Sequence, residues 1–214
     1  MVEILFQDEN FIAVNKPIDV NSIAGRNEQN EVVLLKMVEE IAGQKLYVVH
    51  RLDKQVSGVM VFAKTATSHK YLNDLFFKGE VTKQYLALVY GVLKSDEEII
   101  DKPIREYGSG RMAVDFRQGK KSLTICQVKK RYKQYTLVNI YPKTGRRHQI
   151  RVHLYSLGHP IVGDLQYGDK TEATKYPRLM LHSEKITFLD PNNQEITISA
   201  PTPELFNRII DKIK

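Results

Sequence analysis

The sequence predicts a single α+β domain over residues 1–214, with a mainly antiparallel or mixed sheet and helices packed against it. Three observations lead to this prediction. Short segments rich in Val, Ile, Leu and aromatic residues recur between turn residues, as they do in strands. A smaller number of segments place apolar residues at helical spacing. No repeat or interdomain linker interrupts the chain, and 42% of its residues are apolar, which is enough to build one core.

The first part of the chain is expected to contain strands and two helices. Asp8, Glu9 and Asn10 separate two short apolar runs and predict a hairpin turn. Apolar residues at helical spacing predict each helix, and Gly43 and Gly79 predict where the helices end. In chain order the expected elements are strands at 3–6 and 11–14, a helix at 32–42, strands at 46–49 and 59–63, and a helix at 68–78.

The second part is expected to contain more strands, two helices and two long loops. An alternating pattern predicts a strand at 83–92. Charged and Gly-rich residues predict a loop or flexible hairpin at 106–121, and polar residues predict another loop at 168–178. The other expected elements are strands at 123–128 and 136–141, a helix at 146–157, strands at 179–182, 185–189 and 195–199, and a helix at 205–213.

The basic residues of the chain are unevenly distributed. The formal net charge is +7, and no acidic residue occurs between Asp115 and Asp164, a stretch that contains eleven Lys and Arg residues. A region of one charge repels itself unless a polyanion or a buried carboxylate balances it. RNA or DNA is therefore the favoured partner, and a solvated basic face is the alternative.

The composition also indicates where in the cell the protein is expected. The single cysteine, Cys126, rules out an internal disulfide and a cysteine-based metal site, and we expect it in the core. No apolar run approaches the roughly 18 residues that span a bilayer. The N-terminus reads directly into a predicted strand and has no basic and apolar leader. We therefore expect a soluble, cytoplasmic protein.

The most informative polar motif is HRLDKQVSG at residues 50–58, between two apolar segments. Asp53, in this predicted turn, is the candidate functional group, and a surface ion pair with Arg51 or an Asx-turn is the alternative. Arg147 and Arg151 are one turn apart in the helix predicted at 146–157. A guanidinium from this helix could pair with Asp53 and keep it ionised in a partly buried site, where it could act as a nucleophile or a base.

Other chemistries find no support in the sequence. It has no Gly-rich phosphate loop followed by Lys and Ser or Thr, no His-Glu-x-x-His pattern and no Gly-x-Ser-x-Gly motif. The six histidines are not at metal-ligand spacing, and no second carboxylate pairs with Asp53 for glycoside hydrolysis. We therefore expect neither a metal nor a cofactor, and a reaction without a redox step or net group transfer.

Five ordered motifs resemble those of the RluA-type pseudouridine synthases, over nearly the whole chain. The motif at residues 50–58 resembles the family's signature around its catalytic Asp. The others are Asn-Lys-Pro at 15–17, the tyrosine strand at 83–91, the arginine helix at 144–151 with the loop at 158–164, and Leu-x-Leu-His at 179–182. The resemblance implies an isomerase that converts uridine in RNA to pseudouridine. Because the chain has no room before Ile4 for the N-terminal S4-like domain that some relatives carry, we expect a stand-alone catalytic domain.

The resemblance also implies a role for each candidate residue. Asp53 would be the catalytic carboxylate, and Arg151 would pair with it and orient it. Tyr85 would contact the target base, although a core-facing strand tyrosine is the alternative. Arg51 would enter the RNA stack in place of the flipped nucleotide. The expected partner is a stem-loop of ribosomal or transfer RNA, bound in a basic cleft by a monomer without metal.

Two positions depart from the family's pattern. Val56 stands where the family usually has Thr, and Ile18-Asp19 follow Pro17 where a Gly is common. Activity is still expected, because neither change affects Asp53. Target choice is expected from the loops at 18–30, 106–121 and 168–178, and Ala24-Gly25-Arg26 favours a short stem-loop target. The competing hypothesis is a non-catalytic RNA-binding protein or RNA chaperone on the same scaffold.

Overall fold

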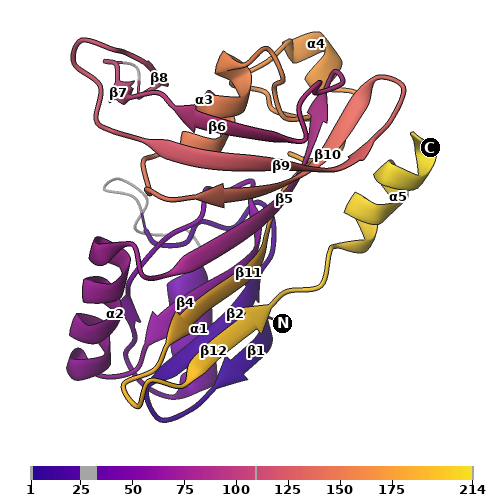
Figure 1. Ribbon diagram of the computed structural model, residues 1–214. Coiled ribbons are helices and arrows are strands. Elements are labelled where there is room, and N and C mark those ends of the chain that lie inside the picture. The colour runs from indigo at the N-terminus through magenta and orange to yellow at the C-terminus, as the bar shows by residue number, and fades with distance from the viewer. Residues whose placement is uncertain (1, 25–32, 109, 214) are drawn as a thin grey trace. The chain divides into compact units, whose positions relative to one another are not determined.

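The computed structural model describes residues 2–24, 33–108 and 110–213 (Figure 1). Most of the segment Ala24-Gly25-Arg26, and residues 25–30 of the loop predicted at 18–30, lie outside the described residues. The chain divides into two compact units. The first unit comprises Met1–Thr82 and Ser183–Pro201, and the second comprises Lys83–His182 and Thr202–Lys214. Both combine antiparallel strand pairs with helices, which confirms the predicted α+β class.

The first unit is built on a sheet in which the pairs β1–β2, β2–β4, β3–β4 and β11–β12 are antiparallel. Its strands occur in the order β1-β2-β4-β11, β12 pairs with β11, and β3 pairs with the end of β4. Every residue of β4 is buried, so this strand lies in the centre of the unit and shows no polar alternation. The elements are β1 (Glu3–Gln7), β2 (Phe11–Lys16), α1 (Leu34–Ala42), β3 (Tyr47–Val48), β4 (Ser57–Ala63), α2 (Ala66–Lys78), β11 (Leu181–Leu189) and β12 (Glu195–Ser199).

The core of the first unit joins the sheet to α2. Phe11 of β2 packs edge-on against Phe188 of β11, with 5.5 Å between the ring centroids, and Leu72 of α2 is buried in the same cluster. Helix α2 begins two residues before the predicted start, because Thr65 is its N-cap and its hydroxyl oxygen accepts the Ser68 N–H at 3.1 Å. It ends at Gly79, as predicted.

The second unit is built on the antiparallel strands β5-β10-β9-β6. Cys126 of β9 is fully buried, which confirms the prediction for this residue, and burial raises the pKa of its thiol to about 12. The elements are β5 (Thr82–Tyr90), β6 (Glu97–Asp101), β7 (Ile104–Glu106), β8 (Met112–Val114), β9 (Leu123–Arg131), β10 (Tyr135–Pro142), α3 (Gln149–Ser156), α4 (Lys170–Ala173) and α5 (Glu204–Lys212).

Several boundaries in the second unit differ from those predicted. Helix α3 begins at Gln149 rather than at 146, because His148 has a left-handed backbone with φ 52°. The loop or flexible hairpin predicted at 106–121 is a hairpin, whose first strand, β7, begins two residues before the predicted start. The loop predicted at 168–178 contains α4, which Asp169 caps. The strands predicted at 179–182 and 185–189 form one strand, β11. None of the helices in the described part of the chain is long and apolar enough to cross a membrane.

Candidate active site

Asp53 lies on a tight turn between β3 and β4 in the first unit. The Val56 N–H donates to the Asp53 carbonyl at 3.0 Å, so residues 53–56 form a closed turn, named here the Asp53 turn. Leu52 and Val56 on its two sides are buried, Asp53 is half-buried, and Arg51 is exposed. The structure therefore places Arg51 and Asp53 on one loop, with buried apolar side chains next to them.

The side chain of Lys16 binds the backbone of the Asp53 turn. This side chain is fully buried at the end of β2. The ammonium donates to the carbonyl oxygens of Pro17 at 2.9 Å, Lys54 at 3.0 Å and Val56 at 2.8 Å. An ammonium has three N–H donors, and these three contacts use one each. Lys16 thus joins the Asn-Lys-Pro motif to the backbone of the turn.

The residues that follow Pro17 hold the same turn. The Ser22 hydroxyl donates to the Leu52 carbonyl at 2.8 Å and accepts the Leu52 N–H at 3.2 Å. The Asp19 N–H donates to the Lys54 carbonyl at 2.8 Å. Asp19 has φ 62°, a left-handed conformation that Gly adopts most readily and that Asp tolerates. The departure from Gly in this motif therefore keeps the backbone contact.

Two other residues of the HRLDKQVSG motif have structural roles. His50 accepts the Val61 N–H through Nε2 at 2.9 Å, and its ring stacks on Phe76 with 5.1 Å between centroids. Gly58 has φ 115°, and a Cβ at this position would lie 2.1 Å from the Ser183 carbonyl oxygen. Only Gly allows β4 and β11 to approach this closely, so the motif's last residue is required by packing.

In the second unit, Arg151 of α3 forms a buried ion pair with Asp164. Its Nε lies 2.7 Å from Asp164 Oδ2, and its Nη2 lies 2.8 Å from Oδ1. Asp164 also accepts the N–H groups of Gln166 at 2.9 Å and Tyr167 at 3.0 Å through Oδ1. Both side chains are almost fully buried. This two-pronged contact fixes the guanidinium plane, so Arg151 is held in one orientation.

Tyr167 supports the same guanidinium. Its buried ring lies beneath Arg151, 5.0 Å from the guanidinium carbon to the ring centroid. Its hydroxyl bonds to His148 Nδ1 at 2.8 Å and accepts the Met112 N–H at 3.0 Å. Tyr167 therefore holds the His148 side chain at the start of α3.

Gln149 anchors the segment that leads into α3. Its amide oxygen accepts the Thr144 hydroxyl at 2.7 Å and the Arg146 N–H at 3.0 Å. Its amide nitrogen donates to the Leu123 carbonyl at 3.0 Å and the Thr124 hydroxyl at 2.9 Å. The polar groups of the motif at 144–151 therefore do not all face solvent, because two of them, together with two groups of β9, form hydrogen bonds with the buried Gln149 side chain.

Tyr85 lies on β5 opposite Ile140 of β10 and is half-buried. The neighbouring Lys83 is also half-buried, and burial together with the Lys143 charge lowers the pKa of its ammonium. All eleven cations of the acid-free stretch except Arg151 are exposed. Among the described residues, no group of three or more His, Cys, Asp or Glu side chains could hold a metal ion.

Sequence reasoning missed the structural roles of Lys16, Ser22, Asp164 and Tyr167. For Asp164 a signal was present, because it is the first acidic residue after Asp115 and ends the acid-free stretch. Lys16 and Ser22 gave none, because their partners are backbone groups. The predicted contact of Arg151 with Asp53 stays a prediction, since Arg51 and Asp53 belong to the first unit and Tyr85 and Arg151 to the second.

Comparison with known proteins gives consistent matches. A family model described as RNA pseudouridylate synthase matches residues 10–156. The chain is 34% identical over 221 residues to a ribosomal large subunit pseudouridine synthase C of Buchnera aphidicola, covering 98% of this chain and 70% of the relative. It is 37% identical over 222 residues to a tRNA pseudouridine synthase C of Pasteurella multocida, covering 93% and 90%. The structure of the human RNA Pseudouridylate Synthase Domain Containing 1 superposes with a TM-score of 0.82 at 29% identity, over 95% of this chain and 84% of that one.

Proposed function

The chain belongs to the RNA pseudouridylate synthase family and is an isomerase that acts on RNA, and we propose that it converts specific uridines of ribosomal or transfer RNA with Asp53 as the catalytic carboxylate. The names of the two bacterial relatives support these two classes of RNA. We further propose a stem-loop as the recognised element.

The proposed reaction is balanced without a cofactor. The glycosidic bond between N1 of the base and C1′ of the ribose breaks, the base turns, and C5 bonds to the same C1′. The proton on C5 leaves to solvent, and N1 takes up a proton. Asp53 would act either on C1′ as a nucleophile or on a ribose proton as a base.

The observation that carries the proposal is the fixed position of the Asp53 turn. Its backbone is held by the buried Lys16 ammonium, by the Asp19 N–H and, through Leu52, by the Ser22 hydroxyl. An aspartate that only formed a surface ion pair would not require support from three residues of another segment. A carboxylate fixed in this way is pre-organised for reaction with a positioned ribose.

The other proposed roles follow the family's motifs. Arg51 is exposed next to Asp53, which suits a planar cation that stacks in the RNA helix after the target nucleotide has flipped out. Arg151 is fixed by Asp164, which suits a residue that orients the catalytic carboxylate. Tyr85 is half-buried, which leaves part of its side chain accessible to the base.

These roles need residues of both units, so we propose that residues 1–214 act as one catalytic domain. We also propose a cytoplasmic location, where ribosomal and transfer RNA would be available. The expectation of a monomer stays a prediction.

The test is tritium release from RNA that carries uridine labelled at C5. Transfer RNA and ribosomal RNA are assayed separately with the wild type, with Asp53→Asn, and with Asp74→Asn as a control for loss of a carboxylate. Asp74 is exposed on α2 in the same unit. We expect release by the wild type and Asp74→Asn, and none by Asp53→Asn although it still binds RNA. Release by Asp53→Asn would refute its catalytic role. No release by the wild type from either pool, with RNA binding retained, would favour the RNA chaperone.

A further inference from the structure

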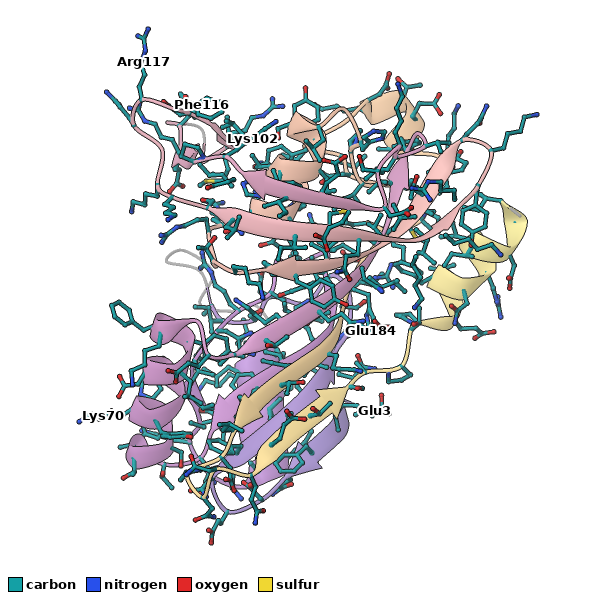
Figure 2. All side chains as sticks on the ribbon, viewed as in Figure 1. Glu3, Lys70, Lys102, Phe116, Arg117 and Glu184 are labelled. Atoms are coloured by element: carbon teal, nitrogen blue, oxygen red, sulfur yellow. The ribbon has the colours of Figure 1, made fainter. Side chains whose placement is uncertain are left out.

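The most exposed aromatic side chain of the second unit lies in a basic segment that the catalytic roles do not use. Phe116, in the loop after β8, has 75% of its side chain exposed. Residues 102–121 contain six basic and two acidic residues. Figure 2 labels Phe116 and Arg117 on this loop, where the Arg117 side chain extends away from the ribbon. Single exposed aromatic side chains are common on protein surfaces, and what distinguishes Phe116 is the basic segment around it.

The loop that carries Phe116 has a defined conformation. Asp115 Oδ1 accepts the N–H groups of Arg117 at 2.8 Å and Gln118 at 2.9 Å, and the Asp115 carbonyl accepts the Gly119 N–H at 2.9 Å. The Asp115 N–H donates to the Pro103 carbonyl at 2.9 Å. A Cβ at position 119 would lie 2.3 Å from the Asp115 carbonyl oxygen, so the turn requires Gly there. Phe116 is therefore held on a pre-organised turn, which lowers the entropy cost of binding.

The acidic residues of the segment are engaged within the second unit. Asp115 Oδ2 accepts the Tyr107 hydroxyl at 3.1 Å and the Arg105 guanidinium at 3.3 Å. Hydrogen bonds from the backbone N–H groups of the turn lower the pKa of Asp115 to about 2, so it stays ionised. Glu106 pairs with Arg147 at 2.7 Å. Arg117, Lys120 and Lys121 are exposed around the turn and give it a positive surface.

An exposed aromatic ring among exposed cations fits one kind of ligand well. Nucleic-acid bases stack on aromatic side chains, while Lys and Arg contact the adjacent phosphates. A protein partner would be expected to place an aromatic anchor among apolar neighbours with few charges. The composition of the loop therefore favours RNA over protein.

We propose that Phe116 stacks on an unpaired base of the RNA, and that Arg117, Lys120 and Lys121 bind the phosphates beside it. This proposal deepens the proposed function, because it names a second recognition site, in the β8–β9 loop, for unpaired nucleotides of the same substrate. A stacking contact of this kind does not read the sequence strongly, because every base has a π-face. It would select RNA with a loop over RNA that is fully paired.

The test compares RNA dissociation constants by fluorescence anisotropy. The probes are a hairpin RNA with an unpaired loop and a duplex made from the same stem. Replacing a stacked aromatic by Ala removes an interaction that typically changes affinity by about tenfold. We expect Phe116→Ala to weaken hairpin binding by about that factor and duplex binding by less than about twofold, since the duplex offers only phosphates to this site. Phe116→Trp should keep hairpin affinity, and Phe116→Leu should not.

The control is Phe77→Ala, which removes another exposed aromatic residue, with 93% of its side chain accessible on α2 of the first unit. It should change binding of neither probe. The inference is overturned if Phe116→Ala binds the hairpin like the wild type, or loses both probes equally. It is also overturned if Phe116→Leu binds the hairpin as tightly as the wild type does. That result would indicate a general apolar contact, of the kind a protein partner makes, instead of stacking.

Binding and turnover fail separately in these experiments. A selective loss of hairpin affinity in Phe116→Ala, together with no tritium release by the wild type, would keep the RNA-stacking site and refute the proposed function. Tritium release by the wild type, together with unchanged hairpin binding by Phe116→Ala, would support the proposed function and refute the RNA-stacking site.

Discussion

The buried ammonium of Lys16 offers the sharpest test of how the Asp53 turn is held. Lys16→Met keeps the length and apolar stem of the side chain but removes all three N–H donors. The three carbonyl oxygens that accepted them belong to Pro17, Lys54 and Val56. The variant therefore isolates the hydrogen bonds from the packing of the stem.

The magnitude follows from the burial of each contact. The contact with Val56 is buried, whereas those with Pro17 and Lys54 are partly buried and their oxygens can bind water. An unsatisfied buried acceptor costs about 1–3 kcal/mol, and each partly buried contact contributes about 0.5–1.5 kcal/mol. Removing the desolvated ammonium offsets part of this loss. We expect a net loss of about 2–4 kcal/mol, which leaves a folded majority in a protein with a typical stability of about 5–15 kcal/mol.

Two measurements separate folding from activity. Urea unfolding gives the change in the free energy of unfolding, and tritium release under native conditions gives kcat for the folded enzyme. We expect kcat to fall by at least about tenfold, because a small displacement of a positioned catalytic group can cost as much as about a hundredfold. The control is Lys70→Met on α2, labelled in Figure 2, whose exposed side chain should leave both quantities unchanged.

Unchanged stability together with unchanged kcat in Lys16→Met would refute the reasoning, because the Asp53 turn would then hold its shape without the ammonium. A loss of stability with normal kcat would show that Lys16 supports the fold and not the position of Asp53.

Three further predictions concern the surrounding structure. Asp164→Asn should lower the free energy of unfolding by about 3–5 kcal/mol in urea, because Arg151 would keep a buried charge without its carboxylate; a loss below about 1 kcal/mol would contradict this. Gly58→Ala should lower the melting temperature far more than Gly43→Ala. The Cβ added at position 58 would lie 2.1 Å from a backbone oxygen, whereas a Cβ at position 43 would meet nothing within 4 Å. Equal losses would show that the positive φ shared by both positions, and not the steric clash, sets the cost. Burial lowers the pKa of His153, so the unfolded chain binds its proton more readily. The contribution of His153 to stability is therefore complete above its unfolded pKa of about 6.5 and is lost as the pH falls below that value. Melting temperatures recorded across this range should fall less steeply for His153→Gln, and identical slopes would exclude His153 as the cause.

The periodicity of the sequence predicted most elements, because it reports which face of a segment is buried. The helical spacing of apolar residues placed α2 to within two residues of its start, and Gly79 placed its end. The beginning of α3 could not be predicted this way, because it depends on a left-handed His148 and on a Tyr167 contact nineteen residues away. Short elements such as β7 and α4 contain too few residues for a period to show.

The residues of the candidate site also differ in how far the sequence predicted them. Asp53, Arg51, Tyr85 and Arg151 were predicted because their side chains belong to recognisable motifs. The burial of Lys16 was not predicted, because its partners are carbonyl groups that every residue carries. The Arg151–Asp164 pair lies between these cases, since both residues were in quoted motifs but their contact depends on how the loop after α3 folds back.

The two departures from the family's pattern become understandable once the backbone is seen to carry the contacts. Val56 contributes its N–H to the Asp53 carbonyl and its own carbonyl to the Lys16 ammonium. Asp19 contributes its N–H to the Lys54 carbonyl. None of these three contacts uses the side chain that differs, and the Val56 side chain is buried, where Val avoids the cost of burying a hydroxyl. A sequence can therefore change at both positions and keep the geometry of the Asp53 turn, whereas we expect a change at Lys16 to alter that geometry directly.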